Sequence, residues 1–381
     1  AQGQKLQLRY QSHPSVGGFD VTIRILRTGK ASHADLPQIE KLGYTPWQIE
    51  QLKETTQSAW GGVFIAGITG SGKTTTLTAL LSQLASQGQR KIISIEDPVE
   101  YMVPGVSHFS IQRQAKGSAH NPFESAMMAF LRMDPDVGMF GEIRDQVSGH
   151  MAHAAIQTGH KLLTTVHATS ALGIIARLTS QHIGLIREDV CTPDFLSILV
   201  YQVLVPKNCV HCSVPAVQVM KPQSLAAYEK FFKLDPSQFR SASDTGCPQC
   251  QVIGLENTDN VHVGVNGVKV CAEVIPITTE LMHLMRKHED IQARESWLSQ
   301  RQSGFDEEDM LGKEAWGHAL FEMSRGVLDP YHFERTFGPP AILASSRNPA
   351  ETKAVWEGWR TISPPMRKDY ADLVAMANEG S

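Results

Sequence analysis

The amino-acid sequence predicts an α/β fold in which helices cover both faces of a parallel β-sheet. From residue 63 onward, short apolar runs alternate with segments whose apolar residues recur three and four positions apart. This is the pattern of parallel strands joined by helices. A glycine-rich loop also stands between the first of these runs and the first of these helices. Both observations place the expected sheet in the first half of the chain.

The composition is that of an ordinary globular chain with room for two or three domains. The 381 residues are 41% hydrophobic and 19% charged, which is enough apolar material for a large core. The formal net charge of −4 does not suggest a strongly basic nucleic-acid binder, so no nucleic-acid partner is expected. The longest apolar stretch, 195–205, is shorter than the ~20 residues that cross a bilayer.

Residues 1–30 are expected to be the end of a domain whose beginning is missing. The chain does not start with methionine, no signal peptide is visible, and apolar residues alternate with polar ones after a turn at 16–20. A polar linker is predicted at 31–40. Thr45 and Pro46 then have the residue types of a helix N-cap and a first helical position.

Residues 41–205 are expected to form the core domain, followed by two smaller regions. Strands of the core are predicted at 63–66, 91–95, 137–140 and 161–166, with helices after the glycine-rich loop and at 121–131. The next region, 206–275, contains five of the six cysteines and has weaker periodicity. Residues 276–381 are expected to be a helical C-terminal region, with helices at 277–287 and 311–325.

The glycine-rich loop matches the full pattern of a phosphate-binding loop, G-x-x-x-x-G-K-[ST]. Its glycines let successive backbone N–H groups turn toward phosphate oxygens, and the helix that starts near Lys73 adds a positive partial charge. In such loops the lysine reaches the β- and γ-phosphates and the Thr74 hydroxyl ligates Mg²⁺. The alternative is a glycine-rich turn that binds nothing. The predicted nucleotide-binding residues here are Gly67, Ile68, Thr69, Gly70, Ser71, Gly72, Lys73, Thr74 and Thr75.

Carboxylates follow two further predicted strands. Glu96, Asp97 and Glu100 come just after the strand at 91–95, and Glu142 follows the run 137–140. In open parallel sheets ligands bind beyond the carboxyl ends of strands, so these acids could orient the attacking water or, for Glu142, hold Mg²⁺. A solvated acidic turn is the alternative for the first group.

Two histidines, His160 and His167, bracket the strand at 161–166 and could contact the γ-phosphate side of a nucleotide. A lone histidine is more often a structural residue, so that interpretation stays open beside the functional one. His150 and His153 share a predicted helix face, where polar surface residues are a better interpretation than a metal site.

Four cysteines form two Cys-x-x-Cys pairs. Cys209 and Cys212 make the first pair, and Cys247 and Cys250 the second. Because no export signal accompanies them, the pairs are interpreted as ligands of a tetrahedral Zn²⁺ rather than as disulfides. Four thiolates leave no open coordination position, so the expected role of the zinc is structural. A reducing compartment, and therefore the cytoplasm, follows from this interpretation.

Four motifs in order resemble the secretion (traffic) ATPases. The phosphate loop is followed by Ile95-Glu96-Asp97-Pro98-Val99-Glu100, then by Gly141-Glu142-Ile143-Arg144-Asp145 and by Thr158-Gly159-His160 with Thr164-Thr165-Val166-His167. These are similar to that family's Walker A, Asp box, Walker B and His box. Over residues 9–276 the resemblance implies a RecA-like P-loop NTPase core, and it identifies residues 1–30 with the end of an N-terminal α+β domain.

The resemblance also implies roles for particular residues. Glu100 matches the family's general base and Glu142 its Walker B acid, while His160 and His167 match the two His-box positions. Arg9 and Arg24 resemble arginines that reach a nucleotide across a domain or subunit interface.

The implied function is that of a hexameric ATPase, bound at the cytoplasmic face of the inner membrane and working on a membrane platform protein. It would power type IV pilus or type II secretion pseudopilus assembly. A tetracysteine insertion is typical of assembly and secretion ATPases rather than retraction ATPases, although a retraction or export motor, a RecA-like DNA translocase and a non-hydrolysing scaffold remain alternatives. Gly138 and Met139 replace bulkier aliphatic residues of the family's Walker B strand, which favours a type IVb or plasmid-type system.

Overall fold

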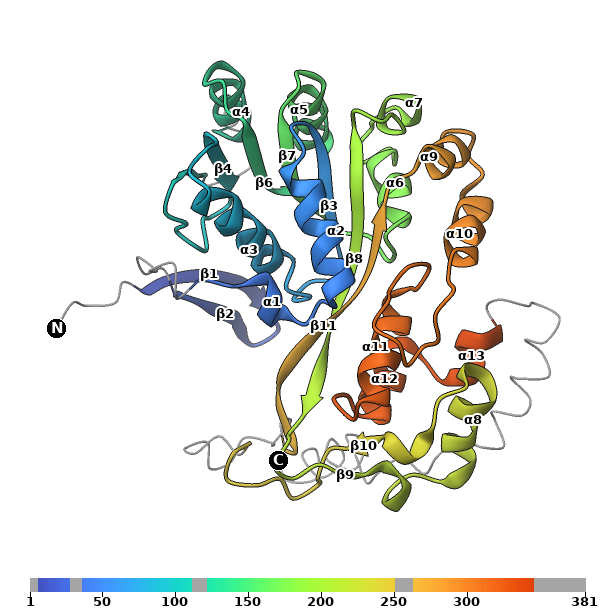
Figure 1. Cartoon of the computed structure of the whole chain (residues 1–381). Coiled ribbons are helices and arrows are strands. Elements are labelled where there is room, and N and C mark those ends of the chain that lie inside the picture. Colours follow the sequence, from blue (N-terminus) through green and yellow to red (C-terminus); the bar gives the residue numbers. More distant parts are fainter. Residues whose placement is uncertain (1–5, 28–35, 112–121, 251–262, 346–381) are drawn as a thin grey trace. The chain divides into compact units, whose positions relative to one another are not determined.

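The computed structural model describes residues 6–27, 36–111, 122–250 and 263–345 (Figure 1). The chain divides into two compact units. The first comprises 1–204, 269–302 and 308–318, and the second comprises 205–268, 303–307 and 319–381. Within the described residues, no helix combines the length and the apolar character that crossing a bilayer requires.

A seven-stranded sheet forms the centre of the first unit, with the strand order β11-β8-β3-β7-β6-β4-β5. The strands from β8 to β5 are parallel, whereas β11 runs back along β8 in the opposite direction (Figure 1). The predicted parallel sheet is therefore confirmed. The strands are β3 (Gly61–Ala66), β4 (Ile92–Glu96), β5 (Val106–Ser110), β6 (Val137–Ile143), β7 (Lys161–Val166), β8 (Leu196–Asn208) and β11 (Val265–Pro276).

Apolar side chains project from both faces of this sheet into two separate cores. On β3, Val63 and Ile65 belong to one core and Phe64 and Ala66 to the other, as the two-residue period of a strand requires. The first core is completed by α1 (Ile39–Leu42), α2 (Pro46–Gln57) and α3 (Lys73–Ser86). The second is completed by α4 (Pro122–Arg132), α5 (Gln146–Gln157), α6 (Gly173–Leu178), α7 (Arg187–Val190), α9 (Thr279–Arg286) and α10 (Asp290–Ser299).

Local sequence sets where these helices begin. The predicted N-cap of α2 is confirmed, because the Thr45 side chain accepts from the Gln48 backbone N–H while the Gln48 side chain accepts from the Thr45 N–H. The space above Gly138 is filled by an aromatic ring. A Cβ built on Gly138 would lie 2.6 Å from the ring of Phe130, which packs edge-on against Phe140. The small residue in this strand is therefore matched by a large one on α4.

The N-terminal segment is the predicted hairpin, formed by β1 (Leu6–Ser15) and β2 (Gly18–Arg27) in antiparallel register. Gly17 supplies the turn with φ +98°. The predicted linker lies partly outside the described residues, and α1 already begins at Ile39.

The second unit is built from short elements. They are β9 (Val214–Pro215), η2 (Ala216–Gln218), α8 (Pro222–Phe232), η3 (Pro236–Gln238), β10 (Arg240–Ser241), α12 (Pro330–Phe337) and α13 (Pro340–Ser345). Helix α11 (Ala315–Ser324) spans the division between the units. The core of the second unit includes Tyr228. The centroid of its ring lies 5.4 Å from that of Phe239 and 6.0 Å from that of Phe333.

The division into units differs from the predicted domain boundaries at residue 275. The sequence placed 269–275 in the cysteine module and 276–381 in one helical region. In the structure β11 carries residues 269–276 into the main sheet, and α9 and α10 bury Leu281 and Trp297 in the core beside it. The predicted C-terminal region is thus split between the two units, and its last part, 346–381, lies outside the described residues.

Candidate functional site

The phosphate loop lies between β3 and α3, where the sequence predicted it. Gly70 and Gly72 both have φ +81°, a left-handed conformation that side chains with a Cβ rarely adopt. Lys73 opens the 14-residue helix α3, so the positive end of the helix dipole faces the loop. Its Nζ donates to the carbonyl oxygens of Gly67 at 2.8 Å and Ile68 at 3.0 Å, which holds the ammonium over the loop.

Three other parallel strands end at the same edge as β3. Asp97 and Glu100 follow β4, Glu142 lies near the end of β6, and His167 directly follows β7. Because parallel strands share the direction of their carboxyl ends, these side chains gather opposite the loop. The resulting cleft has a volume of about 520 Å³ and is lined by residues 69–75 together with Glu96, Asp97, Glu100, Glu142, Arg144 and His167.

Charges of both signs meet in this cleft. The Nε2 atom of His167 lies 3.2 Å from a carboxylate oxygen of Glu142, and Arg144 lies 3.7 Å from the Asp97 carboxylate. Burial lowers the pKa of Lys73, and the Glu142 carboxylate opposes that shift. Four carboxyl groups within one cleft supply the acceptors that a hydrated Mg²⁺ and a water nucleophile require.

The predicted site residues from Thr69 to Thr75 line the cleft with Glu100, Glu142 and His167. Gly67 and Ile68 form the start of the loop, where their carbonyls accept from Lys73. The hydroxyl-bearing Thr74 and the carboxylate of Glu142, the predicted Mg²⁺ ligands, therefore line the same cleft.

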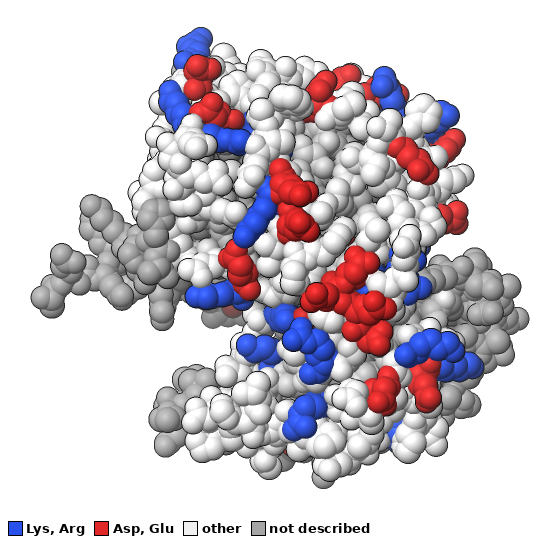
Figure 2. Space-filling model, viewed as in Figure 1, with Lys and Arg blue, Asp and Glu red and all other residues white. Residues whose placement is uncertain are grey.

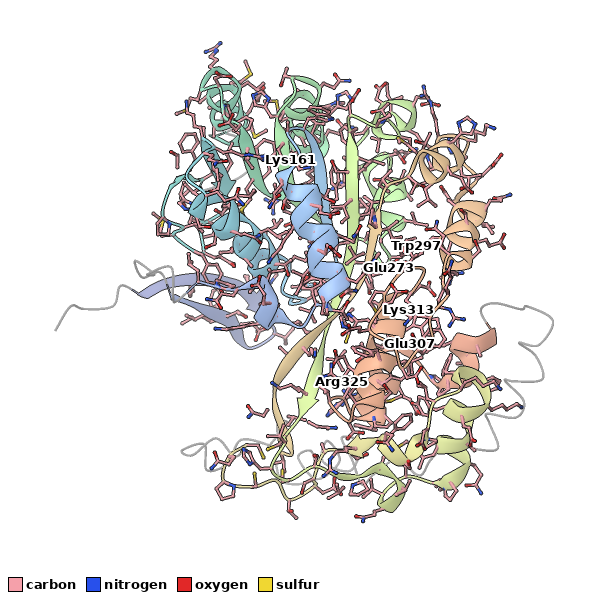
Figure 3. The ribbon with its side chains drawn as sticks, viewed as in Figure 1. Lys161, Glu273, Trp297, Glu307, Lys313 and Arg325 are labelled. Carbon is pink, nitrogen blue, oxygen red and sulfur yellow. The ribbon has the colours of Figure 1, made fainter. Side chains whose placement is uncertain are left out.

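His160 lies elsewhere. It precedes β7 and so sits at the opposite edge of the sheet, which Lys161 marks in Figure 3. A strand of six residues spans roughly 20 Å. The His160 ring contacts Thr158 Oγ1 at 2.8 Å and the Ala155 carbonyl at 3.0 Å, and it is tilted against Phe130. Within this chain His160 and His167 do not lie together, because residues that bracket a strand lie at its opposite ends. The predicted contact of His160 with a nucleotide stays a prediction.

Arg9 and Arg24 are Cα partners on the two strands of the hairpin. The structure describes only their backbone, so their predicted reach to a nucleotide stays a prediction. His150 and His153 lie on α5, where the Nε2 atom of His153 is 4.0 Å from an Asp189 carboxylate oxygen. Burial lowers the pKa of His153, although Asp189 opposes the shift. His150 is exposed as expected, whereas His153 is mostly buried and its ring is tilted against Phe195 at 5.6 Å. Among the described residues the two histidines belong to no converging group of possible metal ligands.

The four paired cysteines converge in the second unit. The sulfur atoms of Cys209 and Cys247 are 3.8 Å apart, those of Cys212 and Cys250 are 3.7 Å apart, and those of Cys247 and Cys250 are 3.9 Å apart. Four ligands at the usual Zn–S distance of ~2.3 Å from a tetrahedral ion stand about 3.8 Å from one another. Among the described residues this is the one group of three or more possible ligands that converges. The cluster is therefore compatible with structural zinc.

Sequence reasoning gave no role to two residues near the phosphate loop, Arg144 and Gln202. Arg144 was seen only as part of a motif, and it pairs with Asp97 inside the cleft. Gln202, on β8, contacts the phosphate loop from within the mostly apolar stretch 195–205. A polar residue interrupting that run was the available signal.

The comparisons with known proteins bear on the family. Residues 1–312 match the family model described as "Type II/IV secretion system protein". The chain belongs to that family. The secretion ATPase resemblance expected from the ordered motifs is thereby confirmed, whereas the type IVb assignment stays a prediction.

Among the curated relatives, the chain is 34% identical over 260 residues to "Type IV pilus assembly ATPase PilB" of Thermus thermophilus, covering 68% of this chain and 27% of that protein. It is 30% identical over 298 residues to "Putative type II secretion system protein E" of Escherichia coli, covering 78% of this chain and 55% of that protein. The chain thus spans about half or less of the length of these relatives.

Solved structures share the fold. The pilus retraction motor PilT with bound ADP has a TM-score of 0.56 at 20% identity, covering 87% of this chain and 78% of that one. The Legionella pneumophila ATPase DotB has a TM-score of 0.56 at 19% identity, covering 87% of this chain and 72% of that one. At these identities the likeness shows the fold alone.

Proposed function

We propose that the protein is an ATPase that powers assembly of a type IV pilus or of a type II secretion pseudopilus. The observation that carries the proposal is the cleft itself, where a complete phosphate loop faces carboxylates from two other strands. Family membership and the two named relatives support the same activity.

The loop and five side chains opposite or within it have roles in this proposal: Lys73 and Thr74 on the loop side, and Glu100 and Glu142 across the cleft, with His167 beside Glu142. The N–H groups of the loop and the Lys73 ammonium hold the β- and γ-phosphates. The Thr74 hydroxyl and the Glu142 carboxylate would hold Mg²⁺, which would neutralise phosphate charge when bound. Glu100 accepts the proton of the attacking water. His167, 3.2 Å from Glu142, orients that carboxylate and lies where the γ-phosphate side of a nucleotide would be.

The wider assembly is part of the proposal. We infer a homohexamer in which Arg9 and Arg24 act on a nucleotide across an interface, on the cytoplasmic face of the inner membrane and against a platform protein. The cysteine cluster, compatible with Zn²⁺, favours the assembly direction over retraction. On the face seen in Figure 2, acidic and basic side chains are interspersed among uncharged ones, a distribution that favours a solvated surface there over a nucleic-acid channel.

Glu100→Gln tests the proposed chemistry. The amide cannot accept a proton, so turnover at saturating ATP and magnesium should fall by about 10²–10⁴-fold while ATP binding persists. Glu54→Gln, an exposed position on α2, is the matched control and should leave turnover unchanged. Phosphate release from Glu100→Gln at the wild-type rate would contradict the assignment and favour a scaffold that binds ATP without using this base.

A further inference from the structure

A fully buried glutamine, Gln202, stands beside the phosphate loop. It follows Tyr201, which pairs with Ala66 at the end of β3, so it reaches the sheet edge where the loop begins. A buried amide is unfavourable unless its donors and acceptor find partners. The sequence offers no packing reason for a glutamine between the apolar residues of β8.

The Gln202 amide is held from both ends. Its Nε2 donates to the Ser71 carbonyl at 2.6 Å. Its Oε1 accepts from the Tyr44 hydroxyl at 2.6 Å and from the Thr76 hydroxyl at 3.0 Å. The opposite amide orientation would place two acceptors, Oε1 and the Ser71 oxygen, against each other. The orientation of the amide is therefore determined by its surroundings.

The bond to Ser71 sets the direction of the next N–H group. The peptide between Ser71 and Gly72 is planar and trans, so its carbonyl and its N–H point to opposite sides. When Gln202 holds the carbonyl, the N–H of Gly72 is turned away from β8. In a phosphate loop such N–H groups are the anion ligands.

The backbone of Gln202 also lies close to the other end of the loop. A Cβ built on Gly67 would lie 2.4 Å from the Gln202 carbonyl oxygen, and one on Gly72 would lie 3.4 Å from its Nε2. Both ends of the loop therefore pack against a single residue of β8.

We propose that Gln202 is a positioning residue for the phosphate loop, that it fixes the Ser71–Gly72 peptide for phosphate binding, and that Tyr44 fixes Gln202 in turn. This inference rests on the proposed function, since it presupposes that the loop binds ATP. Tyr44 is buried and bonds to Thr76 as well, at 3.3 Å. Burial also raises the pKa of Tyr44 far above its usual range, so its hydroxyl keeps its proton.

The test compares Gln202→Met with Gln48→Met in the full chain. Methionine matches glutamine in length but can neither donate nor accept as the amide does. Gln48 is equally buried, and its Nε2 donates to the Ala272 carbonyl at 2.7 Å, so this control loses the same chemical group without touching the loop. Affinities for ATP and ADP with magnesium are measured by calorimetry, turnover by phosphate release, and folding by the melting temperature without nucleotide.

Gln202→Met should lower the affinities for ATP and for ADP about tenfold, equivalent to ~1.4 kcal/mol of binding free energy. Its turnover at saturating ATP should stay within about twofold of the wild-type value. The loop binds the phosphates equally well in the ground state and in the transition state. Losing part of that binding therefore lowers affinity but leaves turnover at saturation nearly unchanged. Gln48→Met should lower the melting temperature but keep wild-type affinities. Tyr44→Phe should lower the affinities for ATP and for ADP about threefold. If Gln202→Met fails to fold, this variant tests the proposal in its place.

Wild-type affinity in Gln202→Met, or in Tyr44→Phe where the methionine variant does not fold, would overturn the inference. An equal loss of affinity in Gln48→Met would also overturn it, because the effect would then be general. The wild type and Lys73→Ala separate this failure from that of the proposed function. If the wild type binds ATP and Lys73→Ala does not, only the inference falls; if the wild type itself does not bind, the proposed function falls with it.

Discussion

Replacing Glu273 by glutamine should raise the free energy of unfolding relative to the wild type, by an amount that increases as the pH rises from about 5.5 to about 7.5. Glu273 lies buried on β11 (Figure 3), and one carboxyl oxygen accepts from the Ala171 N–H at 3.0 Å. Burial, reinforced by the Glu314 carboxylate, raises the pKa of Glu273 to about 8 from 4.5, although the Ala171 bond and Arg294 oppose the shift. The amide of a glutamine can accept the same hydrogen bond without titrating.

The magnitude follows from linkage between protonation and folding. In the folded chain Glu273 keeps its proton up to a pH of about 8, whereas in the unfolded chain it loses the proton near 4.5. The folded state therefore binds more protons between these values, and the free energy of unfolding falls with rising pH by ~1.4 kcal/mol per unit. Between about pH 5.5 and 7.5, the stability of Glu273→Gln relative to the wild type should rise by about 2.5 kcal/mol.

Urea unfolding followed by tryptophan fluorescence measures this difference, since Trp297 is a buried reporter in the same unit. Burial lowers the pKa of Lys161 to about 7 from 10.5, so its contribution to stability rises with pH above about 7. That contribution is common to both proteins and cancels in the comparison. Glu50→Gln, at an exposed position, is the control and should show no pH-dependent difference. A gap between Glu273→Gln and wild type that stays constant or narrows with pH would refute the reasoning.

Three further predictions concern packing and the cysteine cluster. Cys247→Ser should reduce the zinc content from about one ion per chain to near zero, measured by elemental analysis; a zinc-free wild type would contradict the site. Gly138→Ala should lower the free energy of unfolding by ~1–3 kcal/mol, because a Cβ there would lie 2.6 Å from the Phe130 ring; an unchanged urea midpoint would show that the ring yields freely. Arg187→Met should cost about 1–3 kcal/mol in urea unfolding, because the guanidinium donates to the Met285 carbonyl and to both carboxylate oxygens of Asp290; a neutral result would mean that those acceptors find water.

Local signals in the sequence were sufficient for the sheet core and the phosphate loop. The apolar runs at 63–66 and 161–166 became β3 and β7, because strands buried on both faces need continuous apolar residues. The glycines that a tight phosphate turn requires are likewise visible in the sequence. Thr45 and Pro46 indicated the start of α2 for an equally local reason.

Contacts between distant parts of the chain were beyond this reasoning. Nothing local indicates that β11 returns to β8 after the cysteine module, which is why the predicted boundary at 275 differs from the division into units. The pairing of Gln202 with Ser71 joins residues 131 positions apart. The small Gly138 looked like a departure from the family pattern until Phe130 was found to fill the space above it. His160 and His167 belong to one motif in the sequence, but β7 lies between them, so the two side chains are at opposite edges of the sheet.

Equilibrium binding of ATP with magnesium to the wild type and to Lys73→Ala tests the account most directly. Lys73 is half-buried at the start of α3, and its Nζ donates to the Gly67 carbonyl oxygen of the phosphate loop. Its replacement by alanine removes a positive charge and leaves the glycines of the loop unchanged. The wild type should bind ATP in the micromolar range or tighter, and Lys73→Ala should bind it at least about tenfold more weakly, a loss of ~1.4 kcal/mol or more. Equal affinity in the two proteins, or no binding by either, would contradict the assignment of this cleft to a nucleoside triphosphate.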